Sequence, residues 1–201
     1  MIRWTLKKTI AATIQPVTLA EARSFMKMND GETGQDDRIS EMIAAATGLV
    51  EAFIKRQLLT ATWRMRLNRF PCKGILVPMP PTQSVTVQYL DTAGTEQTWG
   101  ASNYVLNTDA DPAEITRAWS VSWPAIREDQ YNSVTVTSVA GYGSAATDIP
   151  EPMRGAMKRA IMGWAETLME FREDVLVGTI KSEAPDILWP WCSCFDRPWL
   201  V

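Results

Sequence analysis

The stretch Ser138-Val-Ala-Gly-Tyr-Gly-Ser-Ala-Ala-Thr-Asp-Ile-Pro-Glu-Pro-Met-Arg154 joins two kinds of structure. Just before it, apolar Val134 and Val136 alternate with threonines, which predicts a half-buried strand over 133–140. Its glycines permit a turn, and its prolines are compatible with the first turn of a helix, where N–H groups have no helical partner. The stretch therefore predicts a change from a β-sheet to a closing amphipathic helix over about 151–172.

Two further helices are predicted on the N-terminal side. Thr18 and Glu21 have the spacing of a capping box, which predicts a short helix ending near Met28. Asp36 or Asp37 is expected to cap a longer helix, in which apolar residues recur at steps of three and four residues until about residue 57.

Between these helices the hydrophobic period changes to two. Trp63, Met65 and Leu67 alternate with Arg64 and Arg66, which predicts a strand with one solvent-facing side over 62–70. Further strands are expected over 74–77, 84–89, 97–99, 103–106 and 114–116, with a hairpin turn over 91–94. The two arginines could contact nucleic acid, although arginine on an exposed strand is common in proteins without such a role.

Together these patterns predict an α+β fold: an antiparallel helical core of about three helices, an inserted antiparallel β module and an extended C-terminal tail. The expected division is an N-terminal arm over 1–16, the helical core over 17–58 and 150–177, the β module over 59–149 and the tail over 178–201.

Charge and hydropathy exclude some partners. The net charge is −3, and no cluster of Lys and Arg is evident, so tight binding of duplex DNA is not expected. No apolar run reaches the roughly 20 residues that a membrane helix needs, and no signal-peptide pattern occurs at the start. The expected compartment is the cytoplasm, and DNA would pass this protein without being held.

The residue inventory argues against catalysis. The chain has no histidine, which removes the commonest general base, and its three cysteines are interpreted as reduced thiols. The glycines 141 and 143 lack a phosphate-binding pattern, Asp109 and Asp111 lack the rest of a calcium loop, and Asp36-Asp37 suits a helix start. We therefore expect no catalytic residues, no cofactor and no metal site.

The C-terminal tail is rich in aromatic residues and broken by proline. We expect Trp189, Trp191, Phe195 and Trp199 to form a partner interface, because prolines prevent them from forming one helical stripe and large aromatics are typical anchors of interfaces. Deletion of residues 186–201 is expected to leave a folded subunit that no longer assembles.

In its order of features the chain resembles the head-to-tail connector (adaptor) proteins of tailed phages and gene transfer agents. The resemblance rests on Val17-Thr-Leu-Ala-Glu-Ala22, Asp36-Asp37 with Ile43-Ala-Ala-Ala46, Val50-Glu51, the exit from Leu58 to Trp63, Phe70-Pro71, Pro78 and Pro81 before Ser84-Val85, Tyr89 with Asp91 and Gly94, Trp123-Pro124, and Gly141-Tyr-Gly143 with Pro150 and Pro152. It is collinear from residue 17 to about 180, while the tryptophan-rich tail departs from the usual family pattern.

The resemblance implies a structural protein of the virion neck, assembled in the host cytoplasm. It implies a homo-oligomeric ring of twelve copies below the portal protein, which extends the DNA channel used in genome ejection and presents a platform for stopper or tail-completion proteins. Two other classes stay open on the residues alone: a monomeric β-rich ligand-binding module, and a hydrolase with an unrecognised site.

Overall fold

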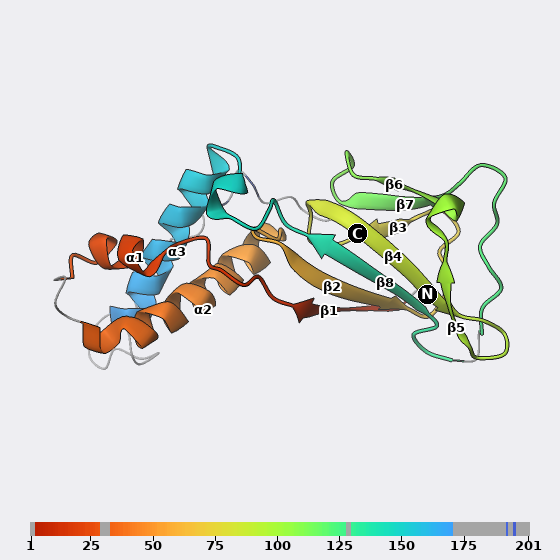
Figure 1. Ribbon diagram of the computed structural model, residues 1–201, viewed down its shortest axis with the longest axis horizontal. Helices are drawn as coiled ribbons and strands as arrows, with labels where there is room; N and C mark the ends of the chain where they lie inside the picture. Colours follow the sequence, from red (N-terminus) through yellow and green to blue (C-terminus); the bar gives the residue numbers. More distant parts are fainter. Residues whose placement is uncertain (1–2, 29–32, 128–129, 171–191, 193–194, 196–201) are drawn as a thin grey trace, which may run out of the picture. The chain divides into compact units, whose positions relative to one another are not determined.

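A computed structural model describes residues 3–28, 33–127, 130–170, 192 and 195 of the 201-residue chain. The chain divides into a β unit, residues 1–12 and 60–142, and a helical unit, residues 13–59 and 143–201. Among the described residues there are three α-helices and two antiparallel sheets, so the chain has an α+β fold (Figure 1).

The larger sheet of the β unit has the strand order β1-β2-β8-β4-β5. Its strands are β1 (Trp4–Ile10), β2 (Ala61–Leu67), β8 (Val134–Ala140), β4 (Thr82–Leu90) and β5 (Glu96–Trp99), and every neighbouring pair is antiparallel. The smaller sheet, in the order β3-β7-β6, consists of β3 (Ile75–Val77), β7 (Ala113–Arg117) and β6 (Tyr104–Asn107). All seven strands expected from the sequence occur, with ends that differ by three residues or fewer.

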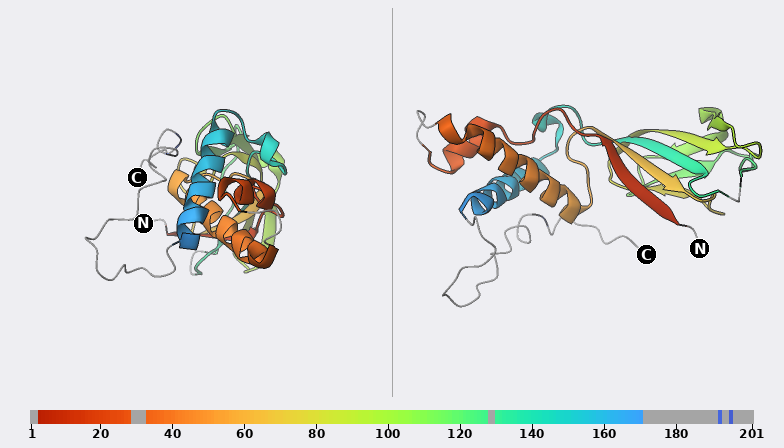
Figure 2. Two further views of the ribbon diagram at one scale, coloured as in Figure 1. Left: turned by 90° about the vertical axis from the view of Figure 1, so that its left-hand side faces the viewer. Right: turned by 90° about the horizontal axis from the view of Figure 1, so that it is seen from below.

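The expected N-terminal arm is instead part of this sheet. Residues 4–10 form β1, which pairs with β2 from Trp4 opposite Leu67 to Ile10 opposite Thr62 (Figure 2). The alternation of Trp4 and Leu6 with Thr5 is a strand pattern. Its pairing partner lies more than 50 residues away along the chain, so the short pattern alone does not reveal the pairing.

The two sheets enclose one apolar core. Its buried residues are Met65, Leu67, Ile75, Val77, Val87, Trp99, Ala113, Ile115, Val134 and Val136, which come from both sheets. An aromatic cluster extends this core: the ring of Trp123 stacks on Phe70 at 4.6 Å between centroids and lies 4.8 Å from Trp99. Tyr104 stacks on Trp99 and donates a hydrogen bond to the carbonyl of Val85, and burial raises the pKa of its phenol. The cluster fixes the long connection between β7 and β8 to the sandwich.

The hairpin turn between β4 and β5 is confirmed. The Asp91 carboxylate accepts hydrogen bonds from the N–H groups of Ala93 and Thr95, each at 2.9 Å, and Gly94 has φ +83°. These bonds lower the pKa of the Asp91 carboxyl, because they favour its charged form.

In the helical unit, α1 (Leu19–Phe25) begins with the predicted capping box. The Thr18 side chain accepts a hydrogen bond from the Glu21 N–H, and the Glu21 carboxylate accepts one from the Thr18 N–H. The same carboxylate contacts Lys158 Nζ at 2.6 Å, and these interactions lower the pKa of Glu21. One residue thus both caps the start of α1 and links it to the helix α3 (Met153–Glu170).

Helix α2 (Asp36–Ile54) starts differently from our expectation. Its N-cap is Gln35, which makes no side-chain capping bond, and Asp36 and Asp37 lie in the first turn, so neither is the cap. Asp36 pairs with Arg23 at 3.0 Å, an interaction that competes with capping. The helix ends at Ile54, three residues before the expected end, and its C-cap Lys55 has φ 55°.

Glu51 organises the exit from α2. Its side chain is buried, and its Oε1 accepts hydrogen bonds from the Leu58 N–H at 3.1 Å and from the Gln57 side chain. The carboxylate therefore supplies partners to polar groups that would otherwise be buried alone at the entry to β2.

The closing helix α3 (Met153–Glu170) packs against α2 (Figure 1). The expected apolar stripe is buried at Met153, Met157, Ala160 and Ile161. Upstream, Gly141 has φ +124°, and a Cβ at Gly143 would collide with the Asp148 side chain, so both glycines are required by the turn. No helix in the described part of the chain is long and apolar enough to span a membrane.

Candidate interaction surfaces

Most of the predicted tail interface lies outside the described residues, including Trp189, Trp191 and Trp199. Phe195 is described and half-buried: its N–H donates to the Cys192 carbonyl at 2.9 Å, and its own carbonyl accepts from Arg56 Nε at 3.4 Å. Cys192 is fully buried. At these two points the tail contacts its own helical unit, so the side chain of Phe195 is only partly available to a partner.

The other sequence candidates occupy structural positions. The turn at 141–143 is not the N-terminus of an α-helix, because a short 3-10 helix (Ala146–Asp148) follows it and α3 begins ten residues later. Asp109 is exposed in a turn, and its N–H donates a hydrogen bond to the side-chain oxygen of Asn107. Within the described ranges, no group of three or more His, Cys, Asp or Glu side chains could hold a metal ion.

One face of the larger sheet carries a concentration of positive charge. Because Met65 and Leu67 point into the core, Arg64 and Arg66 point outward, and the register places Lys7 opposite Arg64 and Thr5 opposite Arg66. The outward residues are Thr5, Lys7, Ile10, Thr62, Arg64, Arg66, Ser84, Thr86, Gln88, Leu90, Glu96, Thr98, Thr135, Thr137 and Val139. We call this surface the basic face.

The basic face has little acid to neutralise it. Its single carboxylate among the described strand residues is Glu96, on the edge strand β5. In the described part of the chain, Lys7, Arg64 and Arg66 have no salt bridge. The rest of this face consists mainly of hydroxyl side chains, which both donate and accept hydrogen bonds.

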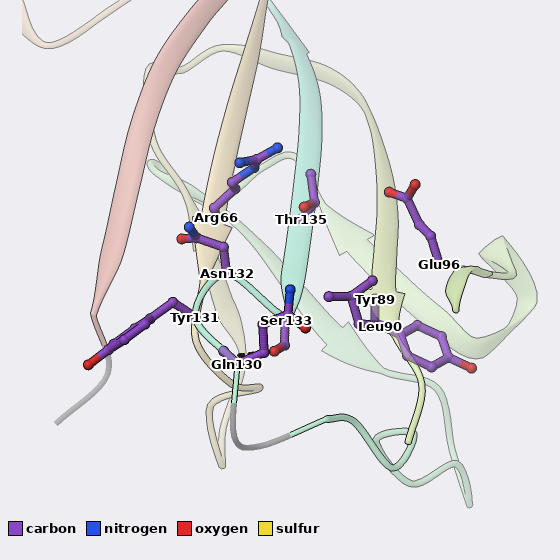
Figure 3. A pocket seen from close by; sticks show the side chains of 9 residues that line it. All are labelled: Arg66, Tyr89, Leu90, Glu96, Gln130, Tyr131, Asn132, Ser133 and Thr135. Atoms are coloured by element: carbon purple, nitrogen blue, oxygen red, sulfur yellow. Dashed lines mark hydrogen bonds between the residues drawn. The ribbon is translucent and has the colours of Figure 1, made fainter. Parts of the chain in front are cut away.

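A pocket of about 350 Å³ opens at one end of the basic face. Figure 3 shows Arg66 and Thr135 on adjacent strands, with Asn132 and Ser133 on the loop that leads into β8. Tyr131 lies at the same pocket and is 73% exposed. The Nε of Arg66 is buried and has no hydrogen-bond partner among the described residues.

The loop wall of this pocket is anchored to β4. The Arg127 N–H donates to the Leu90 carbonyl at 3.1 Å, and the Leu90 N–H donates to the Ser133 carbonyl at 2.9 Å. Ser133 Oγ lies 2.7 Å from the carbonyl oxygens of Arg127 and Gln130. The side chains around Arg66 are therefore presented by a backbone with many internal bonds.

The outer face of the smaller sheet has a different character. Leu76 and Val105 point outward and are about half exposed, with Glu114 beside Leu76 in the register. Trp119 follows β7 in a turn closed by the bond from the Val121 N–H to the Ala118 carbonyl, and its side chain is 97% exposed. The two faces of the sandwich are thus chemically distinct.

Sequence reasoning found part of these surfaces. The alternation in β2 predicted that Arg64 and Arg66 lie on the outward-facing side of the sheet, as observed. It missed Lys7, which joins them only through the pairing of β1 with β2, and it missed Tyr131 and Asn132. For Lys7, the available signal was the alternation of apolar and polar residues in Trp4-Thr-Leu-Lys7. For Tyr131 and Asn132, no local sequence pattern indicated that their loop would line a pocket.

The fold is shared with chains of gene transfer agent (GTA) particles. A chain in a structure described as the neck of an empty GTA particle, computed with C6 symmetry, aligns with TM-score 0.78 and 18% identity over 98% of this chain and 97% of that one. Chains from the virion of a native GTA particle and from the neck of a native particle, computed with C12 symmetry, align with TM-scores of 0.75 and 0.74, at 18% and 17% identity and the same coverage. At this identity the likeness establishes the fold. No protein-family model and no curated protein matches the chain.

Proposed function

We propose that this protein is a head-to-tail connector (adaptor) subunit in the neck of a phage-like particle. In this role it forms a ring below the portal, extends the DNA channel and provides a platform for stopper or tail-completion proteins. The observation that carries the proposal is the likeness of the fold, over 98% of the chain, to chains from particle necks. The collinear sequence features described above support the same family.

The character of the surfaces is consistent with an assembly role. The described residues present one sheet face with Lys7, Arg64 and Arg66 and another with exposed Leu76 and Val105, and Trp119 is exposed in the turn after β7. Tryptophan is enriched at protein interfaces, so the exposed Trp119 supports this role. We propose no enzymatic activity, because a ring subunit acts by its shape and contacts.

The direct test uses tailless, portal-containing particles that lack this protein. Purified protein is incubated with such particles, which are then sedimented and imaged by electron microscopy. We expect co-sedimentation and a ring of added density at the portal vertex. A protein that remains monomeric and leaves this vertex bare would contradict the proposed function.

A second experiment tests the role of the tail. Because Cys192 is buried and Phe195 contacts the helical unit, we favour substitution of Trp189, Trp191 and Trp199 by alanine over deletion. Truncation of an anchoring aromatic costs about 2 kcal/mol or more, so the triple variant should fold normally and bind particles at least about tenfold more weakly.

The matched control is Trp4→Ala, which removes a 57% exposed tryptophan outside the tail and should retain particle binding. Circular dichroism and thermal melting establish whether each variant is folded. If the triple variant binds like the wild type, the docking surface lies elsewhere; if it melts far lower, the tryptophans belong to the subunit's own core.

A further inference from the structure

The chain crosses between its β unit and its helical unit three times, after residues 12, 59 and 142. The crossings adjoin three neighbouring strands, β1, β2 and β8, at the same end of the larger sheet. Ile10 at the end of β1 lies opposite Thr62, and Ala61 at the start of β2 lies opposite Ala140 at the end of β8. Because neighbouring strands are about 4.8 Å apart, the three crossings leave the sheet side by side.

One side chain fixes two of these crossings on the side of the β unit. A register shift between β4 and β8 leaves Gln83 outside the ladder of paired residues. Its Nε2 donates hydrogen bonds to the Gly141 carbonyl at 2.7 Å and to Thr60 Oγ1 at 3.1 Å. The Gly141 N–H in turn donates to the Pro81 carbonyl at 2.8 Å. Because Thr60 and Gly141 adjoin β2 and β8, Gln83 ties both crossings to β4.

The helical unit fixes the same two crossings on its own side. Leu58 and Leu59 are buried, and the Leu58 N–H donates to the Glu51 carboxylate at 3.1 Å. On the other crossing, a Cβ at Gly143 would collide with the Asp148 side chain, so the backbone there lies close against that residue. These two crossings therefore change from one unit to the other over very few residues, 59–60 and 141–143.

The crossing that follows β1 is longer. Residues 11–15 form no helix or strand, and all but Ala12 are exposed. Pro16 and Val17, which come next, are buried. An exposed segment of this kind can change its φ and ψ angles without losing packed contacts. It can therefore follow a movement that the two short crossings define.

We propose that the three crossings form a hinge about which the β unit rotates relative to the helical unit. Hinges are a few loop or element-terminal residues that absorb changes in φ and ψ. The two short crossings are the pivots, and the line through them is the axis of rotation. At the second pivot, Tyr142 absorbs the change between Gly141, which is bonded to Gln83, and Gly143, which lies against Asp148.

The hinge goes beyond the proposed function, which concerns contacts of this protein with other proteins. The basic face and the exposed Trp119 both belong to the β unit. Rotation about the hinge therefore turns these surfaces while the helical unit keeps its own contacts. One subunit could in this way meet partners at different angles without a change in either unit.

Paramagnetic alignment tests the hinge in the full-length protein. A lanthanide tag is attached to Cys72, which is exposed in the β unit, in a chain that carries Cys194→Ser; Cys192 is buried. Residual dipolar couplings then give one alignment tensor for each unit, averaged over motions faster than about a millisecond. In a single rigid body the two tensors have equal magnitude. Because the tag aligns the β unit and rotation averages the couplings of the other, we expect the tensor of the helical unit to be at least about 1.5-fold smaller.

Two variants test the part played by Gln83. Gln83→Ala and Gln83→Met remove the amide that ties the pivots to β4, so each should reduce the tensor of the helical unit by about a further 1.5-fold. The matched control is Gln97→Ala, which removes an amide bonded to the Asp91 carboxylate at 3.0 Å, at the hairpin turn of the same unit, and should match the wild type. Circular dichroism checks folding, and Gln83→Met keeps the test decisive if Gln83→Ala does not fold.

Each result supports or overturns a stated part of the proposal. Equal tensor magnitudes in the wild type would mean that the two units move as one body, and the hinge would be overturned. Unequal tensors in the wild type, with Gln83 variants that behave like Gln97→Ala, would support the hinge and overturn the role of Gln83. Neither measurement uses particles, so the hinge and the proposed function fail separately.

Discussion

Removing Trp123 should detach the long connection between β7 and β8 from the β sandwich. Its ring contacts Phe70 at 4.6 Å and Trp99 at 4.8 Å, and each aromatic pair contributes about 0.5–1.5 kcal/mol beyond burial. Full burial of a large apolar side chain adds about 1.5–3 kcal/mol, and Trp123 is only half-buried. Trp123→Ala should therefore lower the free energy of unfolding by about 3 kcal/mol, measured by urea titration followed by circular dichroism.

A matched substitution separates ring packing from hydrogen bonding. The Nε1 of Trp123 is buried without a partner among the described residues, so Trp123→Phe keeps an aromatic ring and removes an unsatisfied donor. We expect it to stay within about 1 kcal/mol of the wild type. Trypsin gives a local readout, since cleavage after Arg127 should become faster in Trp123→Ala. A loss below about 1 kcal/mol, with unchanged cleavage, would refute the anchoring role of Trp123.

Two further predictions concern buried or paired carboxylates, and a third concerns DNA. Glu51→Leu should cost about 2–4 kcal/mol in urea unfolding, because it leaves the buried Leu58 N–H and Gln57 side chain without their acceptor; a cost under about 1 kcal/mol would mean that other groups replace it. Lys158→Met should cost about 0.5 kcal/mol near pH 7. The folded-state pKa of Glu21 lies below its ordinary value of 4.5, so this stabilisation is present above about pH 4.5 and is lost as the pH falls through the folded pKa. The free energies of unfolding of wild type and variant should therefore converge in acid. A difference between them that stays constant in acid would contradict this. In a fluorescence assay at about 150 mM salt, the isolated protein should show no sub-micromolar binding to duplex DNA, and tight binding with a steep salt dependence would contradict the expectation drawn from its net charge of −3.

Local patterns were sufficient for most elements of this fold. The capping box at Thr18 specifies its helix through two hydrogen bonds between residues three apart, and the period-2 alternation in β2 specifies which side chains are buried. Both signals lie within a few residues of chain. The predicted cap of α2 was wrong because Asp36 pairs with Arg23. Arg23 lies thirteen residues earlier in the chain, outside the few residues that a capping pattern covers.

The candidate surfaces were less accessible to sequence reasoning, because they depend on pairing between distant segments. Lys7 and Arg64 are 57 positions apart and meet only through the β1–β2 register. The pocket at Arg66 also requires the 130–133 loop to return beside β4 through backbone bonds, which carry no side-chain signature. The aromatic tail was visible in composition, whereas the burial of Cys192 became apparent only in three dimensions.

The pairing of Ala61 with Ala140 has a consequence for how this protein could be re-engineered or diversified. These residues lie near the two ends of the segment 60–142, so the chain enters and exits the β sandwich at neighbouring points. A segment with adjacent ends can be exchanged for one of another size without stretching its host. Replacing residues 60–142 by a short glycine-serine bridge, with residues 1–12 also removed, would yield a minimal helical scaffold. Conversely, a different sandwich grafted at this junction would give one helical platform a new set of contacts.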